Sequence, residues 1–155
     1  MLKVISNSTP IIALCAIDQL DILKKMYGEI IVPSAVRDEV NSKENIIKDN
    51  SFFKVIKIKN NEAKKLFKMS LHPGEVEVLI LANEIKSDLC IIDDLLARKY
   101  ANYLAIKITG TLGVLIKAKQ NGIIEKIKPL LDELIKNGIF ISKELYTVVL
   151  NCVNE

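Results

Sequence analysis

Six acidic or amide side chains occupy positions from which they could hold a divalent cation. They follow predicted strands or lie on predicted helices, and all of them offer oxygen atoms. Oxygen-only ligand sets suit Mg²⁺ and Mn²⁺, and such ions orient a phosphate and stabilise a leaving oxygen. The set therefore points to phosphoryl transfer rather than acyl transfer. The six residues are Asn7, Glu39, Glu75, Glu77, Asp93 and Asp94.

Two kinds of hydrophobic pattern alternate along the chain and must position these side chains. Short apolar or β-branched runs typical of strands occupy residues 2–5, 30–32, 52–59, 89–92 and 106–108. Helical patterns occupy residues 10–26 with a break near Asp18, and residues 34–40, 61–68, 73–85, 93–104, 111–119, 123–136 and 144–153. This alternation predicts an α/β fold, with a parallel sheet covered by helices on both faces. The polar stretch 41–50 is predicted to be a loop or frayed helix inside one domain spanning residues 1–155.

The ends of the predicted strands bring polar side chains to one edge of that sheet. Asn7, Ser8 and Thr9 follow the first strand, Asp93 follows the apolar run 89–92, and Thr111 follows the last strand. Ligands of open α/β sheets bind outside the carboxyl ends of the strands, so these residues are expected to share a rim. Thr111, beside a glycine at a predicted helix start, is suited to hold a phosphate or a water.

Each of these residues also has a purely structural interpretation. Asp93 and Asp94 are suited to cap the helix that follows them. Glu75 and Glu77 suit the positive end of a helix dipole, and they point in different directions because they lie two residues apart. Their joint placement with Asn7 near strand ends favours the functional interpretation.

The composition excludes several classes of protein. With 50% hydrophobic and 26% charged residues among 155, the chain can bury a core and is not disordered. A net charge of +3 is too small to mark a dedicated nucleic-acid binder. The single histidine, His72, leaves almost no material for a zinc site or a Ser-His-Asp triad.

The expected location is the cytoplasm. The three cysteines show no metal-ligand spacing, which predicts buried thiols in a reducing compartment. The sequence opens without a signal-peptide pattern, and no apolar stretch is long enough to cross a membrane.

Four segments resemble, in order, the motifs of the PIN-domain family. The resemblance is to its small prokaryotic branch, the DUF3368-type proteins that are similar to VapC-like toxin ribonucleases. Any one segment is a weak signal, whereas four in order are fairly specific. The segments are 6–14 (SNSTPIIAL), 73–82 (PGEVEVLILA), 92–98 (IDDLLAR) and 109–115 (TGTLGVL).

The resemblance implies a three-layer α/β/α, Rossmann-like sandwich with a five-stranded parallel sheet. It implies a ribonuclease that depends on Mg²⁺ or Mn²⁺ and hydrolyses RNA phosphodiester bonds. Many relatives of this size are toxins of type II toxin–antitoxin pairs and act as homodimers, so an antitoxin protein and a second copy are expected partners beside RNA.

The resemblance also assigns roles to single positions. Asn7 matches the first metal ligand, Glu39 the acid after the second strand, and Glu75 or Glu77 the middle acid. Asp93 matches the principal late acid, with Asp94 as a helper, and Thr111 matches the hydroxyl of the closing motif. The residues expected to contact nucleic acid are Ser8, Thr9, Arg98 and Lys99.

One departure from the family pattern leaves an alternative open. Active PIN nucleases usually carry Asp where this chain has Asn7. An amide oxygen can ligate a hard cation but brings no charge, so metal affinity and water activation should weaken. A catalytically weak or inactive nucleic-acid-binding module is therefore the second hypothesis. A nucleotide or phosphate sensor is disfavoured, because no glycine follows the first strand.

The last helical segment carries an apolar stripe that has several interpretations. Leu145, Val148, Val149 and Val153 recur at helical spacing. The stripe is predicted either to pack on the core of its own chain, to form a dimer seam, or to form a groove for an antitoxin.

Overall fold

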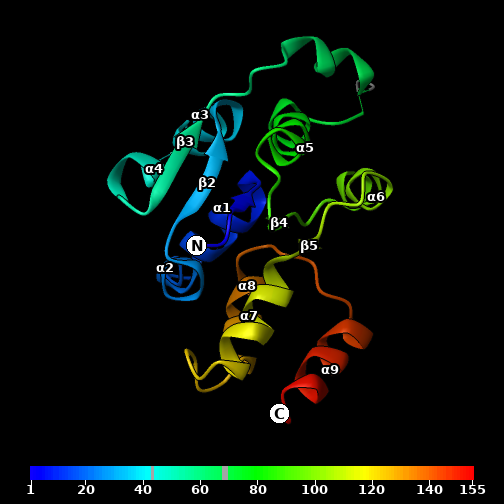
Figure 1. Ribbon diagram of the computed structural model, residues 1–155. Coiled ribbons are helices and arrows are strands. Elements are labelled where there is room, and N and C mark those ends of the chain that lie inside the picture. Colours follow the sequence, from blue (N-terminus) through cyan, green and yellow to red (C-terminus); the bar gives the residue numbers. More distant parts are fainter. Residues whose placement is uncertain (43, 68–69) are drawn as a thin grey trace.

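The computed structural model describes residues 1–42, 44–67 and 70–155. Within these residues, five strands form one all-parallel sheet in the order β3-β2-β1-β4-β5 (Figure 1). The predicted α/β class and the five-stranded parallel sheet are thus confirmed. The strands are β1 (Val4–Ser6), β2 (Ile30–Pro33), β3 (Phe53–Ile56), β4 (Leu89–Ile91) and β5 (Ile108–Thr109).

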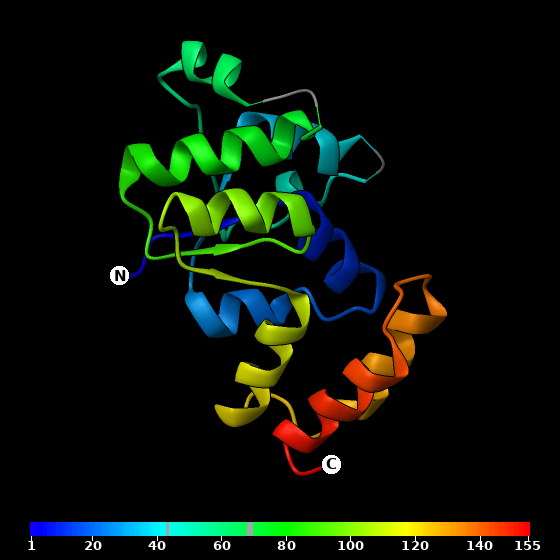
Figure 2. The same ribbon diagram turned by 90° about the vertical axis from the view of Figure 1, so that its right-hand side faces the viewer.

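Helices cover both faces of the sheet. Figure 2 shows α5 and α6 on one side of the strands and α2 and α7 on the other. None of the helices in the described parts of the chain is long and apolar enough to cross a membrane. The helices are α1 (Ser8–Ala16), α2 (Asp21–Tyr27), α3 (Ser34–Asn41), α4 (Ile46–Asp49), the 3₁₀ helix η1 (Asn61–Leu66), α5 (Pro73–Ile85), α6 (Leu95–Tyr103), α7 (Thr111–Gln120), α8 (Lys128–Lys136) and α9 (Lys143–Cys152).

The burial of each strand follows from its sequence. Every residue of β1 and β2 is buried, as a central parallel strand covered on both faces requires. The edge strand β3 exposes Lys54 and Val55 instead. A lysine on an edge strand discourages further strand pairing, so the mixed pattern of 52–59 correctly predicted an edge.

The central strand brings two distant parts of the sequence together. Ile5 of β1 pairs with Ile31 of β2, and Ser6 pairs with Ile91 of β4. The pairing continues one residue further, since the Asn7 N–H donates to the Ile91 carbonyl oxygen at 3.0 Å. The residues that follow β1 and β4 therefore leave the sheet side by side.

The strand predicted at 106–108 lies further along the chain. It covers Ile108 and Thr109, because Ala105 adopts a positive φ of 57° and the Ile106 N–H still donates to the Ala101 carbonyl. Both features belong to the end of α6. A break in the helix pattern of 10–26 was predicted near Asp18, and Asp18 indeed has a φ of 57° between α1 and α2.

Two polar stretches differ in detail from their predictions. The stretch 41–50 contains the short helix α4, and Lys43 within it lies outside the described residues. The helix predicted at 61–68 is a 3₁₀ helix that ends at Leu66, and Lys68 lies outside the described residues.

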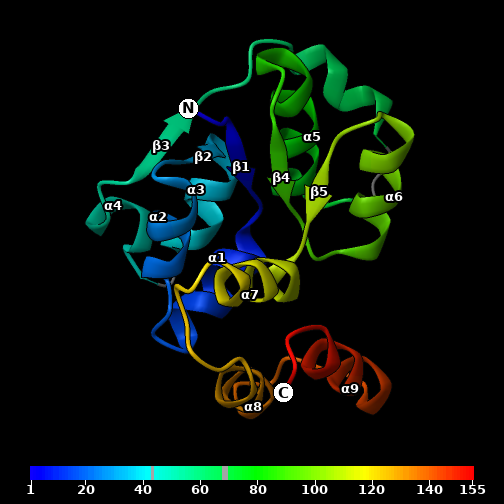
Figure 3. The same cartoon turned by 60° about the horizontal axis from the view of Figure 1, so that its bottom comes forward.

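The last two helices lie beyond α7, on the side away from the strands (Figure 3). Of the apolar stripe on α9, Val149 and Val153 are buried in the core, whereas Leu145 and Val148 are exposed. Part of the stripe therefore packs on the core of its own chain, and part of it remains on the surface. The prediction that the cysteines are buried is confirmed for Cys90 only, since Cys15 is half-buried and Cys152 is exposed on α9.

The side chain of Glu155 holds the C-terminal helices against the rest of the chain. Its carboxylate accepts hydrogen bonds from the backbone N–H groups of Ile127 and Lys128 and from the Lys119 ammonium, at 2.7, 3.1 and 2.6 Å. Burial alone would raise the pKa of Glu155, but these hydrogen bonds outweigh it and lower that pKa to about 2.

Candidate active site

The side chain of Asn7 is buried at the carboxyl end of β1 and lacks a hydrogen bond on its oxygen. Asn7 is the N-cap residue of α1 and is 4% exposed. Its side chain does not cap the helix, and Oδ1 accepts no hydrogen bond from any described residue. Leaving a buried acceptor without a donor costs about 1–3 kcal/mol. A ligand that binds Asn7 Oδ1 would recover this free energy.

Glu39 lies near Asn7 and is hydrogen-bonded to Ser8, the first residue of α1. The Ser8 hydroxyl donates to Glu39 Oε2 at 2.9 Å, which joins α1 to α3. Gly74 of α5 packs against both side chains: a Cβ at this position would lie 3.0 Å from Glu39 Oε2 and 3.6 Å from Asn7 Oδ1. The missing side chain leaves room for these two oxygens at the start of α5.

Glu75 is a second acidic group, at the start of α5. It occupies the first turn of α5, where it is 8% exposed. Burial raises the pKa of the Glu75 carboxyl, and the negative charges of Asp94 and Glu39 raise it further, against the opposing influence of His72. The carboxylates of these three acids therefore interact electrostatically.

Glu77 has a different set of partners, although it lies only two residues further along α5. Its Oε1 accepts a hydrogen bond from the Ala35 N–H at 3.2 Å, and its Oε2 pairs with the Lys64 ammonium at 3.1 Å. Ser34 is the first residue of α3, and Glu77 accepts the hydrogen bond of the Ala35 N–H in the first turn of that helix. Glu77 thus fastens α3 and η1 to α5.

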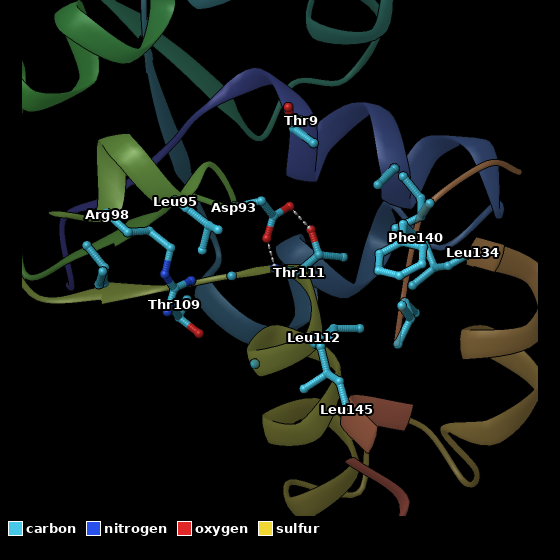
Figure 4. A pocket seen from close by; sticks show the side chains of 16 residues that line it. Thr9, Asp93, Leu95, Arg98, Thr109, Thr111, Leu112, Leu134, Phe140 and Leu145 are labelled. Atoms are coloured by element: carbon cyan, nitrogen blue, oxygen red, sulfur yellow. Dashed lines mark hydrogen bonds between the residues drawn. The ribbon is translucent and has the colours of Figure 1, made fainter. Parts of the chain in front are cut away.

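Asp93 caps the N-terminus of α7 from another part of the chain. Its Oδ1 accepts a hydrogen bond from the Thr111 N–H at 2.7 Å, and its Oδ2 accepts one from the Thr111 hydroxyl (Figure 4). Because two carboxylate oxygens offer about four lone-pair sites, these bonds leave capacity for a further ligand. The neighbouring Asp94 is the N-cap of α6, with Oδ2 accepting from the Ala97 N–H at 2.9 Å.

Gly110 allows Asp93 and Arg98 to approach each other. A Cβ on Gly110 would lie 2.7 Å from Asp93 Oδ1 and 2.9 Å from Arg98 Nη1. Arg98 also donates from Nη1 to the Ile92 carbonyl oxygen at 3.0 Å, which fixes its guanidinium behind the strand end. The Arg98 guanidinium therefore lies near the Asp93 carboxylate.

The remaining residues predicted to contact nucleic acid differ in exposure. Thr9 on α1 and Lys99 on α6 are exposed, whereas Ser8 is buried with its hydroxyl committed to Glu39. The structure therefore brings Asn7, Ser8 and Glu39 together near Gly74, and it places Thr111 and Arg98 beside Asp93. Glu77 contacts Ala35 and Lys64 instead.

A comparison with family models identifies the fold. The model of DUF3368, described as a PIN domain, matches residues 3–155. The chain belongs to the PIN-domain family. Searches of curated proteins and of solved structures found no match. PIN domains are generally associated with nuclease activity, and PIN nucleases typically use divalent metals.

The residues of this PIN domain fit a divalent cation. Among the described residues, no three Asp, Glu, His or Cys side chains form a group able to hold a metal ion. The orphaned Oδ1 of Asn7 nevertheless lies near Glu39 Oε2 and the gap left by Gly74, so this place offers two oxygen donors. Such a donor set matches Mg²⁺ or Mn²⁺.

Sequence reasoning did not identify the two glycines as parts of the site. Gly74 and Gly110 stood in the motifs, but their role depends on which side chains pack against them. The available signal was Gly74 inside the first turn of a strong helix, where alanine is about 1 kcal/mol more favourable.

Proposed function

We propose that this PIN domain is a metal-dependent ribonuclease that hydrolyses RNA phosphodiester bonds with Mg²⁺ or Mn²⁺. The observation that carries the proposal is the buried Asn7 oxygen without a hydrogen-bond donor, next to Glu39 at the carboxyl end of the central strand. Ligands of α/β sheets bind at this end. A cation there would satisfy the orphaned oxygen and offset the repulsion between the acids.

The residues around the rim divide the work. Asn7, Glu39 and Glu75 would hold the cation, which when bound supplies Lewis-acid stabilisation of charge on the phosphate. Burial and the charges of Asp94 and Glu39 raise the pKa of Glu75, and a bound cation would relieve the repulsion that contributes to this rise. Asp93 positions the N-terminus of α7 through Thr111, and the lone pairs that these bonds leave free would contribute a negatively charged ligand to the cation. Arg98 and the exposed Lys99 would hold the RNA backbone.

The first test is cleavage of a pool of labelled RNAs by purified protein with Mn²⁺, Mg²⁺ or EDTA. We expect cleavage that requires metal and is lost in Asp93→Asn. Stability should change little in this variant, because the Thr111 hydroxyl can rotate and accept from the new amide. Unchanged metal-dependent cleavage by Asp93→Asn would remove this residue from the site.

A matched pair of variants tests the choice between the two acids of α5. Glu75 and Glu77 are 8% and 7% exposed on the same helix, so Glu→Gln removes one buried charge in each case. We expect Glu75→Gln to lose cleavage and Glu77→Gln to retain it with reduced stability, because Glu77 serves Ala35 and Lys64. Equal losses of cleavage in two well-folded variants would contradict this assignment.

A second candidate function is a nucleic-acid-binding module with little or no catalysis. The neutral Asn7 favours it, since an amide binds a cation less strongly than a carboxylate. Salt-dependent RNA binding without metal-dependent cleavage would identify this function.

The biological setting of either function is also a proposal. We retain the expectation of a cytoplasmic toxin that forms a homodimer and is neutralised by an antitoxin protein. The exposed Leu145 and Val148 on α9 offer apolar surface for such a partner. Co-expression with the product of the adjacent reading frame, followed by a growth assay, would test it.

A further inference from the structure

A pocket of about 670 Å³ opens beside Asp93 and Thr111. It lies between the start of α1, the first turns of α6 and α7, and the connection from α8 to α9. Figure 4 shows Arg98 and Phe140 on opposite sides of the pocket, with Thr111 and Leu112 between them. The volume is in the range of small-molecule sites.

One end of the pocket is polar. Asp93, Arg98, Thr9 and Thr109 line it, and they offer both donors and acceptors. The Arg98 guanidinium carries five N–H donors, of which Nη1 contacts the Ile92 carbonyl oxygen. A ligand in the pocket would therefore meet a mixed hydrogen-bonding edge.

Exposed apolar side chains also line the pocket: Leu95 lies beside Arg98 and Asp93, and Phe140 lies on the opposite side (Figure 4). The Phe140 ring is 90% exposed, Leu95 is 78% exposed, and Leu145 is 43% exposed. Single exposed apolar residues need no explanation, but these three line one pocket although they come from three separate segments. Their convergence indicates a site that binds a ligand with an apolar face.

We propose that this pocket binds one unpaired nucleobase of the RNA substrate, with the Phe140 ring as its stacking surface. The inference rests on the proposed ribonuclease function and names the structural class of its substrate. A nucleobase combines a flat π-face, which stacks on an aromatic ring, with a polar edge that suits Arg98 and Thr9. The attached phosphate would lie beside Asp93, which lines the pocket and stands at the rim.

The polar end of the pocket favours a base over an apolar side chain from a partner protein. An aliphatic group that filled the pocket would remove water from Asp93 and Arg98 without replacing its hydrogen bonds, which is costly. A base edge replaces them. We expect the base to be unpaired, because a base inside an A-form duplex reaches the ring only at the cost of its pairing and stacking free energy.

The test compares Phe140→Ala with Tyr103→Ala, each a truncation of a highly exposed aromatic ring. Tyr103 is 87% exposed at the end of α6 and does not line the pocket. Binding of a fluorescein-labelled single-stranded RNA is measured by anisotropy in EDTA, so that cleavage does not interfere. We expect Phe140→Ala to weaken binding by about 5- to 150-fold, as loss of one stacked base implies. Tyr103→Ala should leave binding unchanged, and Phe140→Trp should restore it.

A substrate carrying an abasic nucleotide completes the experiment. The abasic nucleotide replaces the base next to the cleaved bond, and with this RNA Phe140→Ala should cause no further loss. If wild type binds and cleaves RNA, and Phe140→Ala and Tyr103→Ala bind it with equal affinity, the proposed base-binding pocket is refuted. The proposed ribonuclease function is then retained. Binding that depends on Phe140 without any cleavage would support the pocket and refute the ribonuclease. A change of oligomeric state in Phe140→Ala, with RNA affinity unchanged, would assign the surface to a protein partner instead.

Discussion

The substitution Asn7→Asp probes the site most directly, because it adds one charge at nearly constant volume. The oxygen of Asn7 has no hydrogen-bond donor, so the change removes no bond at that atom. In EDTA the new carboxylate adds to the repulsion from Glu39. With a cation bound, the same charge becomes an additional attraction. The variant should therefore be less stable than wild type without metal and gain more from metal.

The geometry sets the size of the effect. Because one point lies 3.0 Å from Glu39 Oε2 and 3.6 Å from Asn7 Oδ1, the two oxygens are within about 6.6 Å of each other. Two unit charges at that distance repel by about 2.5 kcal/mol at an effective dielectric constant near 20. Salt at ~0.1 M reduces this by roughly half for the exposed Glu39. A loss of about 1–2.5 kcal/mol corresponds to a Tm lower by about 2–10 °C in a chain of this size.

The assay is thermal unfolding of wild type and Asn7→Asp at pH 8, in EDTA and across a titration of MnCl₂. Wild type should have the higher Tm in EDTA, and the variant should show the larger rise in Tm with Mn²⁺. Calorimetry should give a tighter Kd for Mn²⁺ in the variant. If the two proteins unfold at the same temperature in EDTA and respond equally to Mn²⁺, Asn7 does not lie in a cation site.

Three further substitutions test separate parts of the structure. Gly74→Ala should change stability in EDTA by no more than about 1 kcal/mol, because the gain in helix propensity is opposed by a Cβ that would lie 3.3 Å from the buried Val36 Cγ2. It should weaken Mn²⁺ binding measured by calorimetry, because the same Cβ crowds Glu39 Oε2. Equal Mn²⁺ affinities of Gly74→Ala and wild type would contradict a cation site next to Gly74. Gly110→Ala suits its extended backbone, with φ −122° and ψ −176°, but its Cβ displaces Asp93, so the cleavage rate should fall about 10- to 100-fold with a native circular dichroism spectrum. Glu155→Gln should lower the free energy of unfolding by about 2 kcal/mol at pH 7. Since the pKa of Glu155 is lowered to about 2 from 4.5, its stabilisation is complete above pH 4.5 and is lost as the pH falls towards 2. The difference between the urea midpoints of the two proteins should shrink accordingly, and an equal difference near pH 2 would refute the assignment.

Elements with strong local signals were predictable from the sequence. Helix α5 begins at Pro73 and ends at Ile85 as the pattern indicates, because proline at the first helical position and a long apolar run are both local features. The alternation of such elements was enough to predict a parallel sheet. The strand predicted at 106–108 was placed too early. Only two residues of β5 pair with β4, and Ala105, shortly before them, has a left-handed backbone conformation at the end of α6.

The division of labour between Glu75 and Glu77 could not be predicted from the sequence. Residues that are two positions apart on a helix point in directions about 200° apart around its axis. Only one of Glu75 and Glu77 can therefore face a given neighbour. Which one does so depends on where α3 and η1 pack against α5, as the contacts of Glu77 with Ala35 and Lys64 demonstrate. The position of Phe140 beside Asp93 likewise depends on how the C-terminal helices fold back over α7.

The central position of β1 in the sheet affects how this protein folds during its synthesis. The strand at residues 4–6 is synthesised first, yet its two neighbours are β2 and the much later β4. A growing chain therefore carries an unpaired strand edge until residue 91 is available, which exposes it to aggregation. The acids of the rim are spread from Glu39 to Asp93, and the helix that Asp93 caps begins only at Thr111. For a protein proposed to cut RNA, this arrangement delays the assembly of the site until Thr111 has been made.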